Sequence, residues 1–138
     1  MRRVYLIFLV CLGMQSFGQQ TPFENSQKQA TATYPEVIKY YQALDAAYPQ
    51  AKLITYGPTD FGEPLHLLVL SKDKTFDPAL IRKQDKRILL INNGIHPGEP
   101  EGIDASMMLA RDLLKGNKLP DNMAVSYTHL TLPTICSV

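Results

Sequence analysis

A histidine and a glutamate three positions apart are the residues of this chain best suited to chemistry. His96 offers an imidazole nitrogen and Glu99 a carboxylate. Both are ligand types that zinc accepts at about 2.0–2.2 Å, and an offset of three residues lets them converge on one ion. A catalytic zinc needs three protein ligands and an open position for water, so this pair is part of a site. The alternative interpretation is that Glu99 is an anion at a helix N-terminus and His96 a polar loop residue.

The segment that carries this pair has the composition of a shaped loop. Glycines at positions 94, 98 and 102 permit backbone conformations that other residues resist, and prolines at 97 and 100 fix φ. Just before it, the apolar run Ile88–Asn92 predicts a strand that is buried on both faces of a sheet. The loop would therefore leave the carboxyl end of a strand, where ligands gather in open α/β sheets.

A helix is predicted directly after this loop. Four apolar residues recur on one stripe from Ile103 onward, and three charged residues are expected to turn away from it. The apolar stripe is Ile103, Met107, Ala110 and Leu114, and the charged residues are Asp104, Arg111 and Lys115. Gly116 is expected to close the helix. Met123 then begins what reads as the start of another strand.

The first half of the chain predicts a helix and a hairpin. The capping-box pattern Thr33-x-x-Glu36 opens a helix over residues 34–48, whose stripe we interpret as a core face rather than a sugar-stacking surface. That stripe is Val37, Tyr41, Leu44 and Tyr48. Runs at 51–56 and 65–70, joined by turn-forming residues, predict an antiparallel hairpin in which His66 is structural. One helical turn is expected around 79–82, and the order of elements reads as α/β.

Charge and the chain's first residues limit the function classes. Lys plus Arg number 14 and Asp plus Glu 13, a net charge of +1, so nucleic acid is not an expected partner. Residues 1–18 have the charged, apolar and small-residue order of a signal peptide, with no permanent membrane span, and predict an exported, periplasmic or extracellular protein. Residues 19–32 are polar and predict a flexible leader.

The last residues of the chain read differently from the rest. The stretch Val125–Thr134 resembles the translation of an adapter used in sequencing libraries, so residues 125–138 are expected to be a non-native tail. A genuine Thr-rich strand is the alternative. Cys11 lies in the predicted signal and Cys136 in this tail, so no disulfide framework is predicted for the chain between them.

The stretch Ile88–Gly102 resembles the zinc carboxypeptidase family of metallopeptidases, and the resemblance extends over about residues 33–125, hairpin included. It implies an α/β fold that is the incomplete N-terminal part of a mixed-sheet carboxypeptidase-like domain, here residues 33–124. It also implies zinc as the cofactor, with His96 and Glu99 as the first and second ligands. The family's third ligand, general base and substrate-binding residues would lie beyond residue 125, so no catalytic residue is assigned.

Two positions depart from the family's digestive-type members. Gly98 and Glu63 stand where those members have arginines, which argues against their familiar carboxy-terminal specificity. The leading hypothesis is a fragment of an exported zinc metallocarboxypeptidase that hydrolyses peptide bonds with zinc-activated water and is inactive as truncated. The alternatives are a zinc-dependent acylase of N-acyl amino acids and a secreted non-catalytic binding domain. The expected partner is accordingly a peptide or an N-acyl amino acid.

Overall fold

A computed structural model describes residues 19–59, 62–96 and 98–129 of the chain. The predicted signal peptide (1–18) and the end of the predicted non-native tail (130–138) lie outside these ranges. Within them the elements are α1 (Pro22–Asn25), α2 (Tyr34–Ala47), β1 (Ala51–Pro58), β2 (Pro64–Leu70), α3 (Pro78–Lys83), β3 (Arg87–Asn93), α4 (Glu101–Lys115) and β4 (Met123–His129). No helix among them combines the length and the apolar character needed to cross a membrane.

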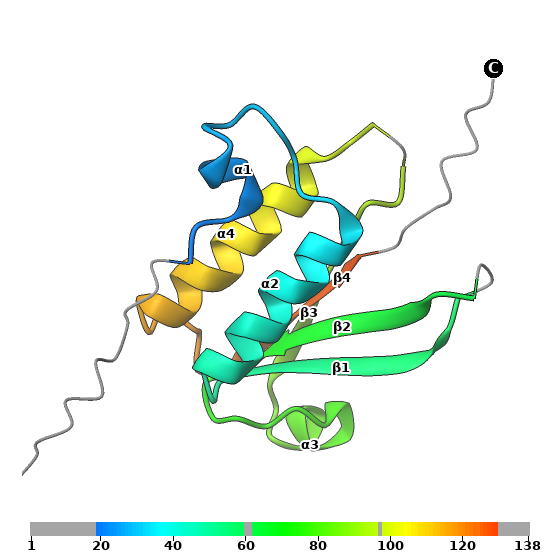
Figure 1. Ribbon diagram of the computed structural model, residues 1–138. Helices are drawn as coiled ribbons and strands as arrows, with labels where there is room; N and C mark the ends of the chain where they lie inside the picture. Colours follow the sequence, from blue (N-terminus) through cyan, green and yellow to red (C-terminus); the bar gives the residue numbers. More distant parts are fainter. Residues whose placement is uncertain (1–18, 60–61, 97, 130–138) are drawn as a thin grey trace, which may run out of the picture.

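The described strands form one mixed sheet in the order β1-β2-β4-β3. β1 and β2 pair antiparallel, β2 and β4 pair antiparallel, and β3 and β4 run parallel. Helices α2 and α4 lie on one face of this sheet, and α3 lies on the other (Figure 1). The predicted α/β class and the predicted hairpin are confirmed.

The core lies between the sheet and the pair α2 and α4. Three residues of the predicted α2 stripe, Val37, Tyr41 and Leu44, are at most 1% exposed, and Tyr48 packs partly buried against them. Strand alternation sends Leu68 and Leu70 of β2 to the same core, because successive side chains of a strand point to opposite faces. The stripe is therefore a core face, as its spacing predicts.

Strand β3 differs from its prediction, because it is not buried on both faces. It lies at the edge of the sheet and pairs only with β4 among the described strands. Ile88, Leu89 and Leu90 are 39%, 45% and 59% exposed. A continuous apolar run predicts that both faces of a strand are covered by other elements. It does not indicate which elements cover them.

Strand β4 runs through Met123–His129 and occupies an inner position of the sheet, between β2 and β3. Val125 and Tyr127 are buried in the core. The sequence predicts only the first residues of a strand here, followed by the non-native tail. In the structure the strand continues four residues past Val125, to His129, and the origin of this stretch stays a prediction.

Residues 19–32 differ from the predicted flexible leader, since they pack against α2 and α4. Thr21 is fully buried and caps α1, with Glu24 completing a capping box. Arg111 of α4 donates hydrogen bonds to the Glu24 carboxylate and, at 3.2 Å, to the Gln19 carbonyl oxygen. The Tyr40 hydroxyl donates to the same carbonyl at 2.8 Å. Arg111 therefore lies off the apolar stripe of α4, as predicted, and its guanidinium contacts this segment.

The glycine at the C-terminal end of α4 does not have the positive φ that is common at this position. Gly116 is the C-cap, but its φ is −83°, and the left-handed conformation falls on Asn117 with φ +48°. A Cβ on Gly116 would lie 2.9 Å from the Asp112 carbonyl oxygen. Glycine is needed here because the chain passes close to the helix end, and not because of a positive φ.

Candidate metal site

The loop from Gly94 to Pro100 connects the end of β3 to the start of α4. Gly94 and Gly98 adopt φ values of +69° and +81°, a region that glycine enters without steric cost. α4 begins at Glu101, and Pro100 is its N-cap. Both predicted ligands lie in this connection, at the carboxyl end of β3.

Asn93 and the first turns of α4 hold the two sides of the connection together. The Asn93 side-chain amide donates a hydrogen bond to the Ser106 hydroxyl. A Cβ built on Gly102 would lie 2.7 Å from Asn93 Oδ1, so a larger residue there would push the Asn93 side chain out of its present position. The strand and the helix can therefore approach closely enough to set the span that the loop must bridge.

His96 and Glu99 point at each other. His96 Nδ1 lies 3.1 Å from Glu99 Oε2, and each side chain is 65% exposed. Two donors that bind one zinc ion at 2.0–2.2 Å with tetrahedral angles lie about 3.4 Å apart. The structure thus has the two side chains in a direct hydrogen bond, slightly closer than two ligands of one ion, and the two donor types fit zinc. His96 and Glu99 therefore lie in contact with each other, and their joint binding of a metal ion stays a prediction.

A third ligand for this pair does not come from the part of the chain that the structure describes. No group of three or more His, Cys, Asp or Glu side chains there could hold a metal ion. His66 makes structural contacts: its Nδ1 lies 2.9 Å from the Thr55 hydroxyl, and its ring centroid lies 6.4 Å from that of Tyr34. The placement of His66 agrees with the structural role inferred for it.

Asp104 is a polar residue whose position the sequence does not reveal. It is 4% exposed, although the helical pattern places it away from the core, and its Oδ1 accepts a hydrogen bond from the Ala32 amide at 3.2 Å. The partner lies 72 positions earlier in the chain, so no local pattern could have found it. The only local signal in the sequence is that Asp104 is a polar residue one turn after the loop.

Comparison with known proteins identifies the fold. No family model matches the chain, and a search of curated proteins found no relative. Among solved structures, carboxypeptidase A from Helicoverpa armigera superposes with a TM-score of 0.59 and 18% identity, over 71% of this chain and 24% of that one. A putative carboxypeptidase from Burkholderia mallei superposes with a TM-score of 0.53 and 22% identity, over 71% of this chain and 25% of that one.

These similarities concern architecture, because the sequence identities are low. The chain spans about a quarter of the length of each of the two solved structures. Over most of its own length it has the mixed α/β arrangement of a carboxypeptidase-like scaffold.

Proposed function

We propose that this chain is part of an exported zinc metallocarboxypeptidase, in which His96 and Glu99 are two of the protein ligands of the metal. The observation that carries the proposal is the 3.1 Å approach of His96 Nδ1 to Glu99 Oε2. It occurs in the loop at the carboxyl end of β3, the edge at which ligands bind in open α/β sheets. The carboxypeptidase-like scaffold supports the peptidase class.

The residues of this chain would bind and orient the metal. Nδ1 is the imidazole nitrogen that faces the carboxylate, so we expect His96 to bind through Nδ1. Asn93 and Gly102 fix the two ends of the loop, which limits how far the pair can separate. A bound zinc supplies a positive charge that polarises a substrate carbonyl and lowers the pKa of a coordinated water to about 7. No third ligand is assigned among the described residues.

The specificity of the complete enzyme should differ from that of digestive-type carboxypeptidases. Gly98 is exposed, with no other group within 4 Å of the Cβ position, and it places no cation beside Glu99. Glu63, at the hairpin turn, is exposed and acidic. Neither position can pair with a substrate carboxylate, so a peptide's C-terminus would need a cation from elsewhere.

A zinc titration of the chain by isothermal calorimetry tests the proposal. We compare the wild type with His96→Ala, Glu99→Ala and the matched control His66→Ala. Each ligand substitution should weaken zinc binding about tenfold or more, while the control should leave it unchanged. Binding by the wild type should also be weaker near pH 5 than near pH 7.5, because histidine must lose its proton to bind a metal. Equal affinity in wild type and His96→Ala would refute the assignment.

A further inference from the structure

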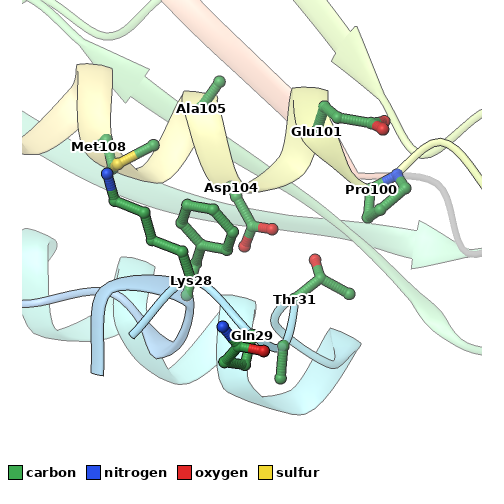
Figure 2. A pocket seen from close by; sticks show the side chains of 10 residues that line it. Lys28, Gln29, Thr31, Pro100, Glu101, Asp104, Ala105 and Met108 are labelled. Carbon is green, nitrogen blue, oxygen red and sulfur yellow. The ribbon is translucent and has the colours of Figure 1, made fainter. Parts of the chain in front are cut away.

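A pocket lies beside the first turns of α4, between that helix and residues 23–31. Its volume is about 440 Å³. Figure 2 shows the pocket with the first turns of α4 on one side and the loop of residues 28–31 on the other. We call it the α4 pocket. Pro100 and Glu101, which line it, directly follow the proposed ligand Glu99, but His96 and Glu99 are not part of its lining.

Asp104 places a buried carboxyl group in this pocket. Its side chain extends from α4 toward the loop of residues 28–31 (Figure 2), and the residue is only 4% exposed. Oδ1 accepts the Ala32 amide at 3.2 Å, and no ion pair among the described residues involves the carboxylate. A buried carboxylate is costly unless a cation or several hydrogen bonds compensate it, so a cationic group in the pocket would be stabilised.

The rest of the lining suits a ligand with an apolar body. Phe23, Pro100, Ala105 and Met108 supply carbon surface, and the stem of Lys28 can add to it. The charged lining residues are Glu101 and Asp104 against Lys28, so the pocket carries one net negative charge. Concave sites with mostly apolar walls and a few polar groups are the usual form of small-molecule sites.

We propose that the α4 pocket binds a small organic ammonium compound, with its positive charge on Asp104 and its apolar part against Phe23 and Met108. The ammonium group could belong to a free amine or to the N-terminus of a short peptide, and both carry the same chemistry. Such a ligand would bridge the N-terminal segment and α4. Because it binds only where these two elements are packed together, it would also stabilise the folded chain.

The test uses three probes of similar shape and different charge: 2-phenylethylammonium, neutral 2-phenylethanol and phenylacetate. Binding to the full chain is measured by ligand-observed NMR with EDTA present. The ammonium probe should bind saturably with a dissociation constant below about 1 mM, and the other two should bind at least about tenfold more weakly. A dipeptide with a free N-terminus, compared with its N-acetylated form, distinguishes the peptide source from the free amine.

Asp104→Asn is the decisive variant, because asparagine keeps an oxygen that can accept the Ala32 amide and removes only the charge. It should weaken binding of the ammonium probe about tenfold, and Ala105→Phe should block the pocket. The exposed control Asp85→Asn should bind like the wild type. Equal binding of ammonium and alcohol, unchanged binding by Asp104→Asn, or no saturable binding to folded wild type would overturn the proposal. His96→Ala should bind the probe normally, which separates this result from the zinc proposal.

Discussion

Asn93 and Gly102 show how one missing side chain can determine the geometry of a loop. The Asn93 amide reaches Ser106 across a position where any Cβ would lie 2.7 Å from its Oδ1. An alanine at position 102 would have to displace Asn93 and break this hydrogen bond. Within a helix, however, alanine is intrinsically favoured over glycine, by about 1 kcal/mol at interior positions and by less in the first turn, where Gly102 lies.

The effect of Gly102→Ala should therefore change sign with the residue at position 93. In the wild-type background we expect a loss of about 1 kcal/mol in the free energy of unfolding, because the hydrogen bond is lost and the contact is too close. In the Asn93→Ala background the same substitution should be stabilising, by less than about 1 kcal/mol because position 102 lies in the first turn of α4. Urea unfolding of the four variants measures both values. Additive effects would show that the two residues do not interact as described.

For single residues, the sequence predicts the interactions between side chains that are close together in the chain. The offset between His96 and Glu99 is short enough to constrain their approach, and the two side chains do meet. The roles of Asp104 and Arg111 depend on partners 72 and 87 positions away. A helical pattern marks both as polar and outward, but it cannot say that another segment of the chain lies there.

Among the elements, α1 and the segment around it are attached by polar contacts more than by apolar ones. Arg111 on α4 holds the Glu24 carboxylate, and the hydrogen bond from its guanidinium is the main reason that the pKa of Glu24 lies below its usual value of 4.5. Burial raises the pKa of the neighbouring Tyr40 to about 12, so its hydroxyl stays protonated and can donate to Gln19. The attachment should therefore depend on the charge of Glu24.

Glu24→Gln should lower stability in a pH-dependent way. Because the pKa of Glu24 is depressed in the folded state, its contribution is complete above the unfolded value near 4.5 and is lost as the pH falls through the lower folded value. The variant should be less stable than wild type by about 1 kcal/mol at neutral pH, and this difference should shrink below about pH 4.5.

Thermal unfolding between neutral pH and pH 3 measures this difference, with Glu101→Gln as an exposed control that makes no ion pair in the described chain. A difference that stays constant down to pH 3 would contradict the proposed attachment by Glu24 and Arg111.

The elements that the sequence predicts best are those whose capping residues and apolar stripes lie within the element itself. The capping residue Thr33 and the apolar stripe behind it place α2 correctly, with Glu36 accepting hydrogen bonds from the Thr33 amide and hydroxyl. The segment at 19–32 has no such apolar stripe, and its hydrogen bonds to α2 and α4 come from the Gln19 carbonyl oxygen, the Glu24 carboxylate and the Ala32 amide. A polar composition suggests flexibility, although here polar side chains supply the packing.

At the scale of the described molecule, strand β3 forms an apolar edge of the sheet. β3 pairs with β4 on one side, and the strand exposes Ile88, Leu89 and Leu90. An edge strand without charges in its centre offers unpaired backbone groups together with apolar side chains, which favours association with another strand. The sequence identifies this run as a strand, but the burial of its faces depends on neighbours that a single segment does not encode.

Leu90→Lys should reduce self-association of the chain. Leu90 is 59% exposed on β3, so a lysine there can reach solvent while its charge opposes strand addition. The control Leu109→Lys changes a leucine that is 46% exposed on α4, away from any sheet edge. Sedimentation velocity at several concentrations should show less association for Leu90→Lys and no change for the control. Equal behaviour of both variants would mean that β3 is not the associating edge.

The most direct test of the central claim observes the histidine nitrogens during zinc addition. Side-chain 15N NMR of the full chain should show the Nδ1 resonance of His96 shifting as zinc is added, while those of His66 remain in place. Glu99→Gln should require a higher zinc concentration for the same shift, because it removes the carboxylate that shares the ion. A His96 signal that stays unchanged while other histidines respond, or a response that is the same with glutamine at position 99, would contradict a metal site built on this pair.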